Sequence, residues 1–131
     1  MVEWKKILLE GDGRRGIGCS YDNPNGSINS GERVFIPVPY GATIIGYYIE
    51  SLRGESGSIE LDIWKKNGEK PVITDSILTS PLLLDGSDFF YSIDLTNFTT
   101  TSIDEVDCLC FYVNKNSNLT GFAISLIVTK D

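Results

Sequence analysis

The segment spanning residues 58–66 alternates aliphatic and polar side chains, and this pattern limits the folds open to the chain. Its aliphatic members are Ile59, Leu61 and Ile63. Successive side chains of a β-strand point to opposite faces, so the alternation predicts a strand with one face on a core. The other face carries Glu60, Asp62 and Trp64. Gly, Asn and Pro on both sides of the segment predict turns.

Similar alternation recurs along the chain, and it predicts an all-β protein. The segments expected to be strands are residues 15–22, 32–38, 43–52, 89–95, 105–113 and 122–128. Pro37 and Pro39 cannot donate to a ladder, which makes residues 32–38 an edge strand. In residues 43–52, Ile45, Tyr47 and Ile49 are expected to share one face, with Gly46 as a possible kink. About eight strands separated by turns predict an antiparallel β-sandwich of jelly-roll type.

The chain of 131 residues has the length of one domain. Residues 13–131 are predicted to form this single sandwich, and residues 1–12 are predicted to be either its first strand or an attachment arm that docks on another protein. The apolar residues of this segment are Trp4, Ile7, Leu8 and Leu9. The irregular connection at residues 71–84 is expected to cover the core with its aliphatic residues, which are Ile73, Ile77, Leu82 and Leu84.

The net charge of −7 argues against nucleic acid or an anionic membrane as a partner. No apolar run approaches the roughly 20 residues of a membrane helix. The first ten residues lack the long apolar stretch and small-residue cleavage site of a signal peptide. The three cysteines, Cys19, Cys108 and Cys110, are odd in number and are predicted to be packed thiols.

The chain contains no histidine, which removes Ser-His-Asp and Cys-His nucleophiles and most zinc sites. Its 18 acidic residues provide many carboxylate pairs, but no spacing selects a glycosidase pair. The acidic segments 85–88 and 104–107 lack the regular spacing of a calcium loop. We therefore expect no catalysis, no cofactor and no metal.

Trp64, flanked by Glu60 and Asp62, suggests a sugar-stacking site on the outer face of the strand at 58–66, to which Tyr48 is a further candidate contact. The alternative is a solvated sheet face without a ligand. Tyr and Trp combine apolar area with a polar group and are frequent at interfaces. The aromatic residues considered as exposed candidates are Tyr21, Tyr40, Tyr47, Tyr48, Trp64, Tyr91 and Tyr112.

Two parts of the sequence resemble proteins of tailed bacteriophages. Residues 4–12, Trp-Lys-Lys-Ile-Leu-Leu-Glu-Gly-Asp, resemble the opening segment of many phage structural proteins. Residues 35–44, with an Ile-Pro turn before a Thr-Ile strand, and residues 56–66, with Gly-Ser-Ile and Asp-Ile-Trp-Lys, resemble a β-sandwich module of phage tail, fibre and head-associated proteins. The order continues through residues 107–113 and 126–130. Phe98 stands where relatives often carry tryptophan.

The resemblance implies a virion structural protein, assembled in the host cytoplasm, that decorates the head or forms part of a fibre or tail. Its partners would be other virion proteins, through the N-terminal arm, and further copies of itself in a homo-oligomer such as a trimer. Some members of the family contact the host surface, so a carbohydrate-binding or receptor-binding module is the alternative. The resemblance transfers no catalytic residue.

Overall fold

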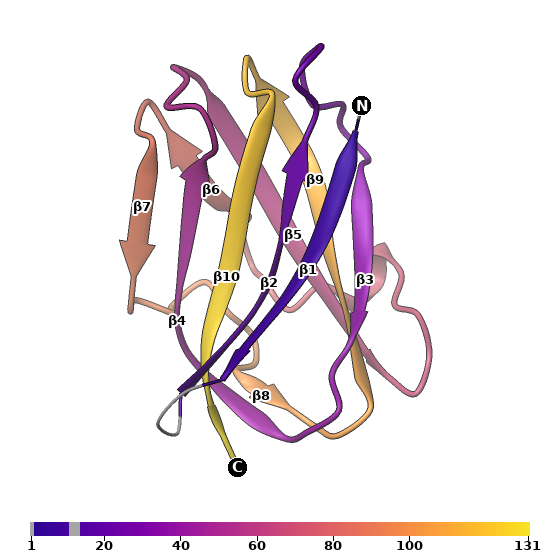
Figure 1. Cartoon of the computed structure of the whole chain (residues 1–131). Coiled ribbons are helices and arrows are strands. Elements are labelled where there is room, and N and C mark those ends of the chain that lie inside the picture. Colours follow the sequence, from indigo (N-terminus) through magenta and orange to yellow (C-terminus); the bar gives the residue numbers. More distant parts are fainter. Residues whose placement is uncertain (1, 11–13) are drawn as a thin grey trace.

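The computed structural model describes residues 2–10 and 14–131, with the backbone alone for residues 7–10 (Figure 1). The described chain forms ten strands and a single 3-10 turn, η1, at Ile73–Asp75. The strands are β1 (Glu3–Glu10), β2 (Arg14–Asp22), β3 (Arg33–Pro37), β4 (Ala42–Ser51), β5 (Ser58–Asn67), β6 (Leu82–Asp85), β7 (Phe89–Ser92), β8 (Ser102–Ile103), β9 (Asp107–Ser117) and β10 (Gly121–Lys130). None of the described helical segments is long and apolar enough to cross a membrane.

The strands form two antiparallel sheets. One has the order β1-β2-β10-β4-β7, with β8 also paired to β4, and the other has the order β3-β9-β5-β6. Four pairs are nested along the chain: β2 with β10, β3 with β9, β4 with β7, and β5 with β6. This nested pairing is the jelly-roll arrangement, so the predicted fold class is confirmed. The edge strand β1 and the two-residue β8 add to the eight strands of the roll.

The core is one apolar layer between the sheets. In β5, Ile59, Leu61 and Ile63 are fully buried, as the alternation predicts. The facing sheet contributes fully buried side chains from β2, β4 and β10, among them Ile17, Ile49 and Ile124. Residues 32–38 also behave as predicted, because β3 lies at a sheet edge and Val34, Ile36 and Val38 point inward.

Two predictions about the core are wrong. Ile44, rather than Ile45, shares the inner face with Tyr47 and Ile49, because a bulge interrupts the pairing of β4 with β10 next to Gly46. Ile73 does not cover the core, since η1 leaves 61% of this residue exposed. Ile77, Leu82 and Leu84 are buried as expected.

The N-terminal segment lies in the six-stranded sheet as β1, paired with β2 from Glu3 to Glu10. Trp4 packs edge-on against Tyr21, with ring centroids 4.7 Å apart, and against Phe122 at 5.9 Å. The predicted attachment role of Ile7, Leu8 and Leu9 concerns side chains outside the described part of the chain.

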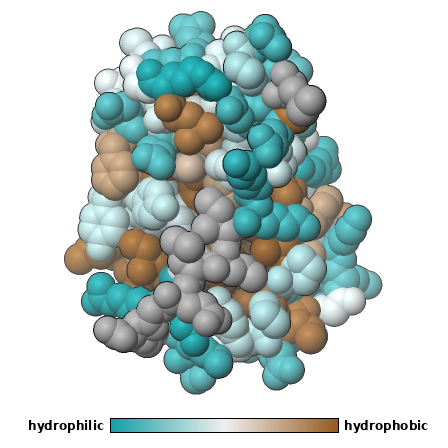
Figure 2. Space-filling view, viewed as in Figure 1, coloured by the Kyte–Doolittle hydropathy of each residue, from teal (hydrophilic) through white to brown (hydrophobic). Residues whose placement is uncertain are grey.

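The two open sides of the sandwich differ in character. Figure 1 shows β6 and β7 on one side and β1 and β3 on the other. Strand β7 is shorter than the predicted segment 89–95, and both of its faces are exposed. Its apolar residues and their exposed fractions are Phe89 51%, Phe90 43% and Tyr91 52%, followed by Ile93 71%. Apolar groups gather at this margin of the molecule in Figure 2.

A substitution at Gly18 of β2 can test how closely β2 approaches β10. A Cβ at this position would lie 2.0 Å from the backbone oxygen of Ile124, whereas a Cβ at Gly26 would meet nothing closer than 3.7 Å. We expect Gly18→Ala to lower the free energy of unfolding by about 3 kcal/mol, because backbone must move. Urea denaturation would measure this, with Gly26→Ala as the control. Equal stability of the two variants would contradict the close approach.

Candidate functional site

The outer face of the four-stranded sheet brings together side chains from three strands. Arg33 of β3 pairs in register with Tyr112 of β9, which pairs with Asp62 of β5. One row further along, Phe35, Cys110 and Trp64 lie across the same three strands. Residues two apart in a strand share a face, so both rows point away from the core. Aromatic and charged groups distant in sequence therefore lie side by side.

Trp64 lies on the outward face, as the alternation predicts, but its side chain is covered. Its ring stacks on Tyr112 with centroids 4.6 Å apart and an interplanar angle of 26°. Only 2% of Trp64 is exposed, so its assignment as an exposed aromatic is wrong. The cover comes from another strand and cannot be read from the alternation of β5.

Arg33 completes the cover over the aromatic pair. Its guanidinium carbon lies 5.4 Å from the ring centroid of Trp64 and 4.9 Å from that of Tyr112. Its Nε donates a hydrogen bond of 3.2 Å to the carbonyl oxygen of Gly31. A guanidinium on aromatic faces is held by cation–π attraction and keeps its terminal N–H groups for other acceptors.

Asp62 holds Trp64 in place. The indole Nε1 donates to Asp62 Oδ2 at 2.9 Å, while Ser76 Oγ donates to Asp62 Oδ1 at 2.6 Å. Glu60, on the same face of β5, lies opposite Lys115 of β9 in the pairing register. Both acidic residues were candidate sugar acceptors, and the oxygens of Asp62 already accept these internal bonds.

A groove borders this cluster, with β3 at its centre. Its larger part is a hollow of about 850 Å³ and a smaller part of about 510 Å³ adjoins it. Arg33, Phe35 and Lys70 line both parts. The larger part has a mostly apolar wall, to which Pro37, Val38, Pro39 and Val106 belong. Its volume falls in the range of roughly 300–1,000 Å³ usual for small-molecule sites.

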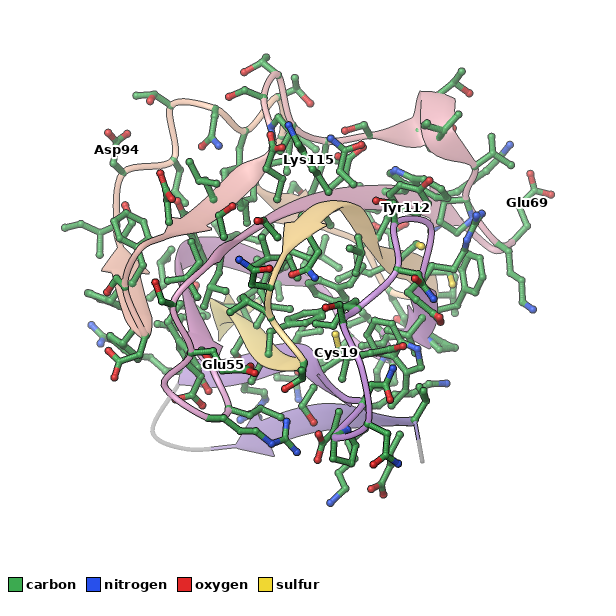
Figure 3. The ribbon with its side chains drawn as sticks, turned by 90° about the horizontal axis from the view of Figure 1, so that it is seen from above. Cys19, Glu55, Glu69, Asp94, Tyr112 and Lys115 are labelled. Carbon is green, nitrogen blue, oxygen red and sulfur yellow. The ribbon has the colours of Figure 1, made fainter. Side chains whose placement is uncertain are left out.

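Lysines complete the groove. The Nζ of Lys70 lies 5.0 Å from the ring centroid of Phe35, and Lys6 of β1 also lines the larger hollow. Among the described residues that line the groove, Glu69 is the one acidic residue, and it forms an ion pair of 2.7 Å with Lys66. In Figure 3, Glu69 and Tyr112 lie on the same side of the sandwich. Arg33, Phe35 and Lys70 were not among the site residues predicted from the sequence. The polar and aromatic residues that alternate with Val34 and Ile36 in β3 were the available signal.

Tyr48, the fourth candidate contact, lies away from this groove. It belongs to β4 in the other sheet, where its ring stacks on Phe89 at 5.8 Å. The candidate aromatic residues Tyr21 and Tyr47 are buried, with 1% and 6% exposure. Tyr91 is exposed and lies on β7. The structure thus separates the predicted sugar contacts between two sheets.

The cysteines are free thiols with low reactivity. Cys19 lies in the core between the sheets (Figure 3), and burial raises the pKa of its thiol, with a smaller contribution from Cys110. Cys108 and Cys110 are two residues apart in β9 and therefore share its outer face. Burial raises the pKa of Cys110 to about 12, although Arg33 acts in the opposite direction. A thiol with such a pKa is a poor nucleophile near neutral pH.

The two acidic segments lie in turns. Residues 85–88 lie at the β6–β7 connection, and their side chains are exposed. In the segment 104–107, Asp107 is buried and accepts from the backbone N–H of Asp104 at 2.7 Å and from Asn67 Nδ2 at 3.0 Å. Its carboxylate also lies 3.4 Å from Lys65 Nζ. Across the described residues, no group of three or more Cys, Asp or Glu side chains is arranged to hold a metal ion.

Comparison of the sequence with protein-family models and with curated proteins gives no match. Among solved structures, the chain is similar to the CBM32 of AlyQ in complex with 4,5-unsaturated mannuronic acid, with a TM-score of 0.44 and 12% identity over 86% of this chain and 76% of that one. It is also similar to Fe(II)-HppE with an alternative substrate, with a TM-score of 0.28 and 14% identity over 96% of this chain and 49% of that one. Neither likeness carries a functional assignment.

The role of Asp62 in holding Trp64 can be tested against Glu60, which lies on the same face of the same strand. We expect Asp62→Ala to lower the free energy of unfolding by about 2 kcal/mol, because Trp64 Nε1, Ser76 Oγ and the backbone N–H of Ile63 lose their acceptor. Glu60→Ala should change it by less than about 0.5 kcal/mol. Thermal and urea unfolding would measure both variants, and equal losses would contradict the role of Asp62.

Proposed function

We propose that this β-sandwich is a non-catalytic binding module and that it binds carbohydrate in the groove around β3. The observation that carries the proposal is the hollow of about 850 Å³ beside Phe35, with Arg33 and Lys70 at its border. A sugar presents apolar C–H faces and a rim of hydroxyl groups. A binding site for it needs an aromatic or aliphatic surface together with a few oriented polar groups.

The groove offers both elements. Phe35 is partly exposed, so part of its apolar ring can contact a sugar. Arg33 and Lys70 are donors held over aromatic rings, which limits the side-chain entropy lost when they bind a hydroxyl oxygen. In this proposal Trp64 supports the site from beneath, because it holds Tyr112 and Arg33, and does not itself contact the ligand.

Glycan binding can be tested by calorimetric titration with a panel of neutral and acidic oligosaccharides. We expect Phe35→Ala to weaken binding about tenfold, since a lost aromatic contact of about 1.4 kcal/mol corresponds to that factor. Phe89→Ala removes an exposed phenylalanine from β7 and should leave the affinity unchanged. Equal weakening by both variants, or no binding of any saccharide by the folded protein, would overturn the proposal.

A second candidate function is assembly into a virion as a structural protein, the role that the resemblance to phage modules implies. The exposed strand β7 favours it, because an edge strand with unpaired backbone groups and apolar side chains on both faces promotes association. The occupant we propose for this edge is β1 of a second copy. Asp88 and Asp94 flank β7. The exposed charged residues among 3–6 of β1 are Glu3, Lys5 and Lys6, and because Glu3 is paired with Lys5 at 3.9 Å, Lys6 supplies the excess positive charge there.

Charge therefore favours pairing of β7 with β1 over pairing of β7 with itself, which would bring aspartates together. Such a head-to-tail contact can close into a ring of identical subunits. Light scattering across a tenfold concentration range would measure the assembly.

We expect the unsubstituted protein to form a discrete oligomer and Tyr91→Lys to be a monomer, because the new charge prevents another strand from pairing with β7. Val72→Lys is the control, since Val72 is 55% exposed and Tyr91 is 52% exposed, but Val72 lies beside η1 and away from β7. A monomeric original chain at all concentrations would overturn the assembly proposal, as would equal disruption by both variants.

A further inference from the structure

The distribution of charge around the groove does not follow the overall charge of the protein. The chain has 18 acidic and 11 basic residues, yet the larger hollow is bordered by Lys6, Arg33 and Lys70 and by one carboxylate, that of Glu69. Lys66 neutralises this carboxylate through its ion pair. The groove is thus a local cationic site on an acidic molecule.

These three cations have no ion-pair partner among the described residues. Arg33 makes one hydrogen bond, through Nε, and Lys70 lies over the ring of Phe35. The charges of these three cations are therefore directed at one hollow without a carboxylate to offset them, and such a cluster attracts an added anion. The apolar wall lowers the local dielectric constant and strengthens the attraction.

We propose that the groove selects a saccharide that carries a carboxylate, with this group held between Arg33 and Lys70. This inference rests on the proposed carbohydrate-binding function and specifies its ligand class. The guanidinium is a planar fork that suits the two oxygens of a carboxylate, and its contacts with the rings of Trp64 and Tyr112 restrict its movement. Phe35 contacts the apolar face of the sugar ring, between the two cations.

The acidic surface outside the groove limits the charge density of the ligand. At a net charge of −7 the protein repels densely charged chains, and three cations cannot offset a long run of sulfates or phosphates. The preferred ligand is therefore an oligosaccharide with isolated carboxylates, such as single uronic acid residues among neutral sugars.

A matched pair of disaccharides tests the inference: cellobiouronic acid and cellobiose, which differ in one carboxylate, together with the corresponding pair of sialyllactose and lactose. Titrations at low and at high salt would compare the affinities. We expect the acidic member of at least one pair to bind about tenfold more tightly at low salt, a difference that decreases as salt screens the charges.

Two variants locate the effect. Lys70→Gln should reduce the acidic preference to within about twofold, because glutamine keeps an N–H donor for a hydroxyl oxygen but loses the charge that attracts a carboxylate, so acidic binding weakens more than neutral binding. Lys115→Gln removes a lysine from the same strand as Tyr112 but outside the groove, and it should keep the preference.

The outcomes separate this inference from the proposed function. Equal binding of the acidic and neutral members would overturn the carboxylate inference and leave carbohydrate binding intact. Binding of sodium acetate as tight as that of the acidic disaccharides would overturn the sugar-binding function. Tighter binding of heparin than of cellobiouronic acid would overturn the preference for isolated carboxylates. If Lys70→Gln keeps the full preference for the acidic saccharide, the carboxylate does not bind in this groove.

Discussion

The single apolar layer between the two sheets is the constraint on which the rest of the structure depends. Side chains of a strand alternate with a period of two, so burial of Ile59, Leu61 and Ile63 determines that Glu60, Asp62 and Trp64 point outward. A register shift of one residue would place charges in the core. The same burial sets the registers of β3 and β9, because Ile36, Leu109 and Phe111 belong to this layer.

The nested pairing of the strands then brings the outward residues of three strands together in one site. Strands β3, β9 and β5 are far apart along the chain, but the jelly-roll order makes them neighbours. Arg33, Tyr112 and Asp62 consequently occupy one row, and Phe35, Cys110 and Trp64 the next. The cation–π and stacking contacts between these rows depend on the core at a distance, since any change of register would separate them.

The two open sides of the molecule suit different interactions. The side with β1 and β3 carries lysines, arginine and prolines around a groove, whereas the side with β6 and β7 exposes aromatic rings flanked by aspartates. Strand β7 contains neither lysine nor proline, the residues that usually oppose association at a sheet edge. In the proposed assembly β7 meets β1 of a second copy, so that contact lies next to the groove, which Lys6 of β1 also lines.

Much of the fold could be predicted because alternation is a local property. The strands, their inward faces and the edge position of residues 32–38 follow from neighbouring residues and from the chemistry of Pro37 and Pro39. Ile44 lies in the core, where Ile45 was predicted, because a bulge interrupts the pairing of β4 with β10. Bulges are hard to recognise from sequence, because one added residue reverses the faces on one side of it.

The candidate site could be predicted only in part. The sequence by itself determined that Trp64 and Asp62 point outward from β5 and that Cys108 and Cys110 share a face. Tertiary structure alone decided that Trp64 is covered by Tyr112 and Arg33, that Tyr48 lies in the other sheet, and that Phe35 and Lys70 border a groove. The reason is physical. The direction of a side chain follows from its own backbone, whereas its exposure and its partners depend on strands brought beside it by the fold.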